Sequence, residues 1–136
     1  MSYAGDVTPS EAYAAATGPE AALLVDVRTR AEWAYVGVPV LEGANEVAFV
    51  EWSSFPDGRV NERFVDEVRA AGLLPGRPVY LLCRSGVRSR AAAAALTSAG
   101  LGPAFNVLEG FEGPHDPQQH RTVAGWKLAG LPWRQG

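Results

Sequence analysis

Cysteine is scarce in this sequence: Cys83 is the only one among 136 residues. A single thiol excludes a disulfide within the chain, and it excludes a zinc site built from several cysteines. The fold must therefore depend on its hydrophobic core. A chain of this length can bury about two-thirds of its unfolded surface in one core, and we expect a single domain over residues 1–136.

Long apolar runs and long basic runs are also absent. No stretch of about 18 apolar residues occurs, and residues 1–16 lack the basic start and the continuous apolar centre of a signal peptide. The formal net charge of −3 gives no reason to expect binding to nucleic acid or to an anionic membrane. We therefore expect a cytoplasmic protein that binds neither, in which any positive field is local.

Apolar runs and helical patterns alternate along the chain. Strands are predicted at residues 21–27, 45–50, 79–82 and 104–108, and helices at residues 9–16, 29–35, 61–71, 91–99 and 123–129. The first strand is apolar almost throughout, which is typical of a strand covered on both faces. The alternation predicts an α/β fold with a parallel sheet and helices on both faces.

Cys83 stands at the junction between a predicted strand and the loop before a predicted helix. Such junctions hold ligand sites in open α/β folds, because the N–H groups of the first helical turn have no intrahelical partner. Cysteine reacts as the thiolate, which a helix amino terminus and the nearby Arg84 and Arg88 would stabilise. An inert core thiol is the alternative. We favour a reactive one, since two arginines and a glycine are an unusual lining for an apolar site.

The segment CRSGVRS, residues 83–89, resembles the active-site loop of the rhodanese-like sulfurtransferase family. Further matches follow the family's order: Asp26-Val27-Arg28 with Glu32, Gly43-Ala44, Leu108-Glu109-Gly110-Phe111, Gly125-Trp126-Lys127 and Gly130-Leu131-Pro132-Trp133. The resemblance extends from about residue 6 to residue 134. It implies a single-domain rhodanese, with an α/β fold around a five-stranded parallel sheet.

The resemblance also implies roles for the loop residues. Cys83 would be the catalytic nucleophile and sulfur carrier, and Arg84 and Arg88 would hold an anionic donor. Backbone N–H groups would come from Ser85, Gly86, Val87, Arg88 and Ser89, with Gly86 allowing a tight loop. Backbone dipoles stabilise an anion without a metal, so no metal and no cofactor are expected.

The implied reaction has two steps. Thiolate Cys83 attacks the outer sulfur of a donor such as thiosulfate and becomes a persulfide, and a thiol or cyanide then takes the terminal sulfur. A protein could also be the acceptor. Because the chain has no second cysteine, the persulfide must be handed to another molecule.

Two other functions stay open on the same residues. A phosphatase or arsenate reductase of the same fold would carry five residues between cysteine and arginine, whereas only residues 84–87 separate Cys83 from Arg88. The shorter loop favours sulfur over a tetrahedral oxyanion. A relay or interaction module of rhodanese fold, which carries a persulfide with little turnover, is the nearer alternative.

Several polar and aromatic residues outside the loop are interpreted as structural. Asp26, Arg28 and Glu32 fit helix capping and an ion pair between Arg28 and Glu32 at four-residue spacing. Trp126 and Trp133 are expected to bury their rings against the sheet.

A metal site at His115, Asp116 and His120 is disfavoured. Histidines five residues apart do not share one face of a helix, and this stretch is rich in proline and polar residues.

Overall fold

The main sheet contains five parallel strands in the order β1-β6-β5-β2-β4. The computed structural model describes residues 2–19, 22–42, 46–54, 57–73, 75–114, 117–118 and 124–135. The strands of the main sheet are β1 (Gly5–Val7), β2 (Leu23–Asp26), β4 (Ala48–Phe49), β5 (Val79–Leu82) and β6 (Ala104–Val107). The predicted α/β fold with a parallel sheet is confirmed, and β5, which precedes Cys83, is its central strand.

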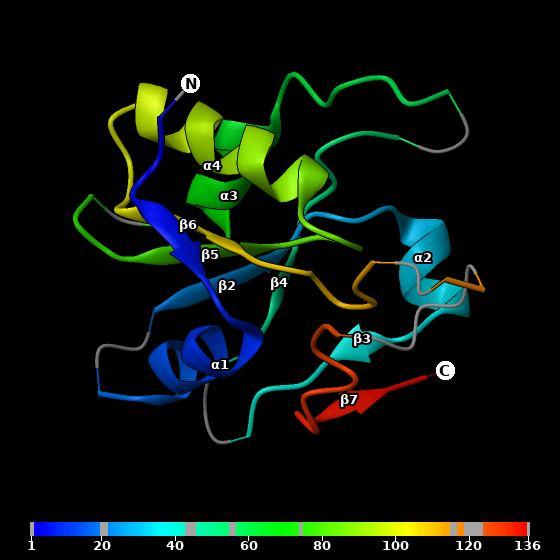
Figure 1. Ribbon diagram of the computed structural model, residues 1–136. Coiled ribbons are helices and arrows are strands. Elements are labelled where there is room, and N and C mark those ends of the chain that lie inside the picture. The colour runs from blue at the N-terminus through cyan, green and yellow to red at the C-terminus, as the bar shows by residue number, and fades with distance from the viewer. Residues whose placement is uncertain are drawn as a thin grey trace.

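Helices cover both faces of the sheet, as predicted. α3 (Phe64–Ala70) and α4 (Val87–Ser98) lie on one face, and α1 (Pro9–Thr17) lies on the other (Figure 1). Two buried clusters correspond to these faces. One contains Phe64 and Leu96 from α3 and α4, and the other contains Ala12 from α1 together with Trp126. β2 and β5 are therefore covered on both sides, which explains their apolar composition.

Two helices have a capping box at their first turn. Thr8 Oγ1 accepts a hydrogen bond from the backbone N–H of Glu11 at 3.1 Å, and Glu11 Oε1 accepts one from Thr8 N–H at 3.0 Å. Thr29 and Glu32 repeat this arrangement at the start of α2 (Arg30–Tyr35). Each box satisfies N–H groups that a helix leaves unpaired at its first turn. In the described part of the chain, no helix has the length and apolar character needed to cross a bilayer.

Short strands are what the sequence pattern missed. β1 has only three residues and pairs with β6 over the register Gly5↔Phe105 to Val7↔Val107. A second sheet consists of β3 (Val38–Pro39) and β7 (Trp133–Arg134), which are antiparallel. Elements of two or three residues contain too few positions to show a period of two.

The predicted helix at residues 123–129 is wrong, because residues 124–130 form bends and turns. Gly125 has φ 108° and Gly130 has φ 77°, so the backbone at both ends of this segment is left-handed. A right-handed helix cannot continue through such residues. A Cβ on Gly125 would also lie 2.8 Å from the backbone nitrogen of Gly113, so this glycine allows two segments to approach closely.

Candidate active site

Cys83 follows the last residue of β5 and is 1% exposed. The backbone N–H of Gly86 donates a hydrogen bond to its Sγ at 3.1 Å. Gly86 has φ 111°, a left-handed conformation that turns the chain directly into α4. The expected tight loop at Gly86 is therefore present, and one N–H group points at the sulfur.

α4 begins at Val87, four residues before the predicted start at residue 91, so that boundary was wrong. Gly86 occupies the N-cap position, and Val87, Arg88 and Ser89 form the first helical turn. The irregular part of the loop is shorter than the sequence pattern indicated. The amino terminus of a 12-residue helix consequently lies beside the thiol, where its unpaired N–H groups favour negative charge.

Ser89 contributes its side chain, a contact that the sequence analysis missed. Its Oγ lies 3.2 Å from Cys83 Sγ, and the residue is fully buried. The direction of side chains on helices could have indicated this contact. A Cβ on a helix tilts toward the amino terminus, so a residue in the first turn of α4 points back at the loop that precedes it.

The two loop arginines differ in their surroundings. Arg88 Nη1 and Nη2 bind Glu32 Oε1 and Oε2 at 2.6 and 2.9 Å, in a bidentate ion pair that is partly buried. Arg84 is exposed and forms no ion pair with any residue that the structure describes. The positive field of the loop therefore comes mainly from Arg84, since Glu32 compensates the charge of Arg88.

The ion pair predicted between Arg28 and Glu32 is wrong. Arg28 precedes the N-cap Thr29 and lies outside α2, so the rule that pairs side chains four apart on a helix does not apply. Arg28 instead binds Asp26 at 2.7 Å, with both side chains fully buried. Glu32 is left for Arg88, which comes from a different helix.

The ionisation of Glu32 reflects opposing effects. Burial raises the pKa of its carboxyl, but hydrogen bonds from Arg88 and from the backbone of Thr29, together with the charge of Arg88, outweigh burial and lower the pKa to about 2. Hydrogen bonding to Glu32 raises the pKa of Arg88. Both groups therefore stay charged throughout the neutral range.

Arg28 ties together three segments beneath the loop. Besides Asp26 on β2, its Nη2 donates to the carbonyl oxygen of Gly37 at 2.8 Å. Its guanidinium carbon lies 4.3 Å from the centre of the Phe111 ring. These contacts connect the end of β2, the start of β3 and the turn after β6, which fits the structural role expected for Asp26 and Arg28.

The turn after β6 holds the start of the loop around Cys83 in place. Phe111 N–H donates to the carbonyl oxygen of Cys83 at 2.8 Å, and Glu112 N–H donates to that of Arg84 at 3.0 Å. Gly110 has φ 56°, and a Cβ at this position would lie 2.3 Å from the Cys83 carbonyl oxygen. Only glycine allows this approach.

An open cleft adjoins the loop, and a larger one lies next to it. The mouth cleft, of about 460 Å³, is lined by residues that include Arg84, Arg88, Glu32 and Tyr35. A larger cleft of about 870 Å³ shares Ser54 with it. Molecules larger than a small anion therefore have room to lie beside the loop.

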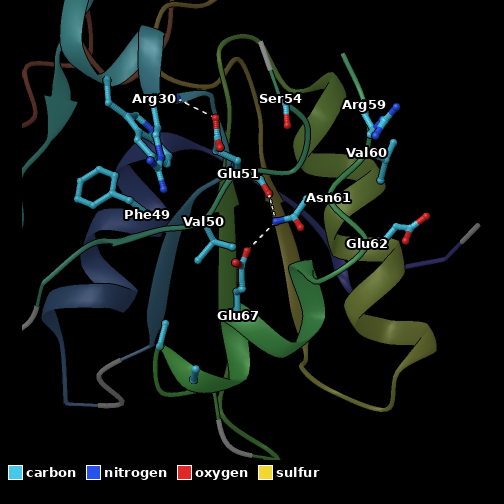
Figure 2. A pocket seen from close by; sticks show the side chains of 13 residues that line it. Arg30, Phe49, Val50, Glu51, Ser54, Arg59, Val60, Asn61, Glu62 and Glu67 are labelled. Atoms are coloured by element: carbon cyan, nitrogen blue, oxygen red, sulfur yellow. Dashed lines mark hydrogen bonds between the residues drawn. The ribbon is translucent and has the colours of Figure 1, made fainter. Parts of the chain in front are cut away.

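Figure 2 shows the larger cleft, with Arg30 and Phe49 on one side and Arg59 and Glu62 on the other. Among the residues that line it, Asn61 Nδ2 donates to the backbone oxygen of Glu51 at 2.9 Å and to Glu67 Oε1 at 2.6 Å. These bonds join the segment after β4 to α3. They fix one wall of the cleft.

The remaining predictions have mixed outcomes. Trp126 is fully buried as expected, but Trp133 is 38% exposed, so its predicted burial is wrong. β7 carries Trp133 at the edge of the small sheet, where its ring is 4.3 Å from Lys127 Nζ. His115, Asp116 and His120 lie outside the described residues, as do Gly43 and Ala44. Within the described ranges, no three His, Cys, Asp or Glu side chains gather as a metal site would require.

Fold and sequence together define the class of protein. The family model of the rhodanese-like domain matches residues 8–115. The chain therefore belongs to the rhodanese-like domain family, and the resemblance drawn from the loop is confirmed.

Individual relatives agree with this assignment. The crystal structure of Rv0390 from M. tuberculosis is 50% identical, with a TM-score of 0.88, and the match covers 99% of this chain and 100% of that one. The protein RC0915 from Rickettsia conorii is 35% identical over 131 residues, which cover 95% of this chain and 96% of the relative. The polysulfide-sulfur transferase homodimer from Wolinella succinogenes is 21% identical, with a TM-score of 0.62 over 96% of this chain and 78% of that one, and this likeness shows the fold alone.

Proposed function

We propose that this protein is a sulfurtransferase in which Cys83 carries a sulfane sulfur as a persulfide. The observation that carries the proposal is the hydrogen bond of 3.1 Å from Gly86 N–H to Cys83 Sγ, made by a loop that leads at once into α4. A donor N–H and a helix amino terminus beside a thiol favour the thiolate that must attack. Membership of the rhodanese-like family supports the same reaction class.

The first step moves one sulfur atom onto the enzyme. Thiolate Cys83 attacks the outer sulfur of thiosulfate, a new S–S bond forms, and the bond to the sulfonate breaks. Sulfite leaves with the electron pair of that bond. The charges balance, because the monoanionic thiolate and dianionic thiosulfate give a monoanionic persulfide and dianionic sulfite. The persulfide extends the side chain by about 2 Å, the length of an S–S bond.

The second step returns the thiolate. Cyanide or a thiolate acceptor attacks the terminal sulfur, and Cys83 leaves with the electrons of the broken S–S bond. The chain has no second cysteine that could attack the persulfide before an external acceptor does. Cys83 is 1% exposed, so bulk water has little access to the sulfur atom that leaves in this step.

We assign recognition of an anionic sulfur donor to Arg84. It is exposed, lines the mouth cleft and forms no ion pair with a described residue. Arg88 lines the same cleft, but its charge is compensated by Glu32 at 2.6 Å. We therefore assign Arg88 mainly to holding the first turn of α4 against α2.

Intact mass spectrometry tests the proposal directly. The purified protein is incubated with thiosulfate, and a gain of one sulfur atom that cyanide or a thiol removes is the expected result. Thiocyanate production is then measured over many turnovers. The variant Cys83→Ser is the matched control, since it changes one atom and should neither gain sulfur nor turn over. Equal thiocyanate formation by wild type and this variant would contradict the proposal.

A persulfide relay to a protein acceptor is a second candidate, favoured by one observation. Tyr35 at the mouth cleft is 82% exposed, and Val87 at the start of α4 is 69% exposed. Apolar surface beside a reactive group is suited to a protein partner. In that case Cys83 still gains sulfur, turnover with cyanide is negligible, and the double variant Tyr35→Ser, Val87→Ser loses transfer to the acceptor protein but keeps sulfur uptake from the donor.

A further inference from the structure

A chain of hydrogen bonds connects Cys83 to an exposed carboxylate on the edge strand β1. Cys83 Sγ lies 3.2 Å from Ser89 Oγ, and Ser89 Oγ lies 2.5 Å from Asn106 Oδ1. Asn106 Nδ2 then donates to Asp6 Oδ1 at 3.0 Å. Ser89 and Asn106 are both fully buried. The two side chains that lie between the thiol and β1 therefore have no access to water.

The chemistry of each group fixes the direction of these bonds. A carboxylate only accepts, so the amide nitrogen of Asn106 must face Asp6 and its oxygen must face Ser89. An amide oxygen also only accepts, so Ser89 uses its single hydroxyl proton in the bond to Asn106. The Ser89 oxygen can then only accept from Cys83. Every donor in the chain points from Cys83 toward Asp6.

We infer that Asp6 is a positioning residue which, through Asn106 and Ser89, disfavours ionisation of Cys83. Ionisation of Cys83 removes the proton that Ser89 accepts and leaves an oxygen lone pair facing the thiolate. Turning the Ser89 hydroxyl toward the sulfur would remove the hydrogen bond of the buried Asn106 oxygen. Both outcomes disfavour the thiolate, whereas the hydrogen bond from Gly86 N–H favours it.

Asp6 remains ionised over the relevant pH range. The hydrogen bond from Asn106, followed by that from the Tyr3 hydroxyl, lowers the pKa of its carboxyl. Arg90 on α4 also faces this carboxylate. Near the thiol, the charged groups are Arg88, compensated by Glu32, the buried pair of Asp26 and Arg28, and the exposed Arg84. None of these other groups determines which way the Asn106 amide faces.

The test uses the fact that Cys83 is the only thiol, so its alkylation by iodoacetamide can be followed without donor or acceptor. Asp6→Ala frees the Asn106 amide to turn, so that its nitrogen donates to Ser89 and the Ser89 proton becomes available to the thiolate. We expect the pH profile of the alkylation rate to move to lower pH, and the rate at neutral pH to rise about twofold to tenfold, the effect of one hydrogen bond.

Two variants serve as controls. Asp6→Asn keeps an acceptor at the same position, and we expect it to retain most of the wild-type profile. Tyr3→Phe removes only the other donor to Asp6, and we expect no change. If Asp6→Ala does not fold, as judged by circular dichroism, Asp6→Ser replaces it, because the shorter side chain does not reach Asn106.

A double variant separates the hydrogen-bond chain from the negative charge of Asp6. In a Ser89→Ala background, Asp6→Ala should have no further effect on the profile. High salt should leave the effect of Asp6→Ala intact, whereas a through-space effect of charge would fade. An unchanged profile in Asp6→Ala, an effect that survives in the Ser89→Ala background, or one that high salt abolishes would each overturn the inference. The inference uses the reactive Cys83 of the proposed function, but alkylation needs no sulfur transfer, so the two can fail separately.

Discussion

Glu32 of α2 and Arg88 of α4, which are 56 residues apart in the sequence, share two hydrogen bonds of 2.6 and 2.9 Å. Glu32 also accepts a hydrogen bond from the backbone of Thr29, so one carboxylate caps its own helix and binds the first turn of another. The loop around Cys83 and the wall of the mouth cleft are therefore fixed relative to each other. A disturbance of Glu32 should affect stability and the site together.

The stability contributed by Glu32 should be lost at acidic pH. Its pKa is about 2 in the folded protein against an ordinary value of 4.5, so its contribution is complete above about 4.5 and falls as the pH decreases toward 2. We expect Glu32→Gln to lower the free energy of unfolding by about 1 to 3 kcal/mol at pH 7, and by much less near pH 2. Urea unfolding of both proteins across this range measures the difference. A difference that does not change with pH would contradict the assignment.

Removal of Arg84 should weaken donor binding more than it slows the chemical step. If Arg84 is the uncompensated cation at the mouth, Arg84→Ala should raise the KM for thiosulfate about tenfold or more, corresponding to about 1.4 kcal/mol or more of lost anion binding. Steady-state kinetics with varied thiosulfate provide the measurement. Arg63→Ala, at the exposed N-cap of α3, is a control for the loss of one positive charge and should leave KM unchanged.

The close approach at Gly110 predicts a large cost for a single methyl group. In Gly110→Ala, the Cβ would lie 2.3 Å from the Cys83 carbonyl oxygen, so the two segments must separate. We expect a loss of about 2 to 5 kcal/mol of unfolding free energy, from left-handed strain and overpacking together. Gly130→Ala isolates the strain, because Gly130 has φ 77° with nothing within 4 Å of a Cβ. A similar, small loss in both variants would show that the contact at Gly110 relaxes easily.

Loss of the buried Arg28 guanidinium should destabilise the whole fold. Arg28→Met would leave Asp26 buried without its ion-pair partner, and breaking such a pair costs about 3 to 5 kcal/mol. Chemical unfolding followed by tryptophan fluorescence measures this loss. The control is Arg69→Met, whose partner Asp66 is 3.7 Å away with both side chains exposed, and this change should cost less than about 1 kcal/mol. Near-equal losses would contradict the structural role of Arg28.

The sequence predicted elements whose signals are local. The apolar run of β2, the capping residue Thr8 and the glycine before α4 each act through near neighbours, and the structure contains the strand, the helix start and the tight loop that they indicate. The position of Cys83 at the end of β5 follows from the same kind of pattern.

Contacts between distant segments could not be predicted in this way. Nothing near Glu32 in the sequence indicates that its partner is Arg88 rather than Arg28, because the choice depends on how α2 and α4 pack. The link between Asp6 and Asn106 has the same origin. Trp133 was expected to be buried, but the exposure of a ring on a two-residue edge strand depends on what covers that edge.

The pairing of β1 with β6 limits when the contacts of β1 can form during synthesis of the chain. Asp6 and Asn106 are 100 residues apart, so Asp6 leaves the ribosome long before its partner exists. At about 5 to 20 residues per second, synthesis of the intervening chain takes about 5 to 20 s. During this interval the loop around Cys83 is also incomplete or newly made. The contact through which we infer that β1 restrains the thiol can therefore form only after Asn106 has been synthesised.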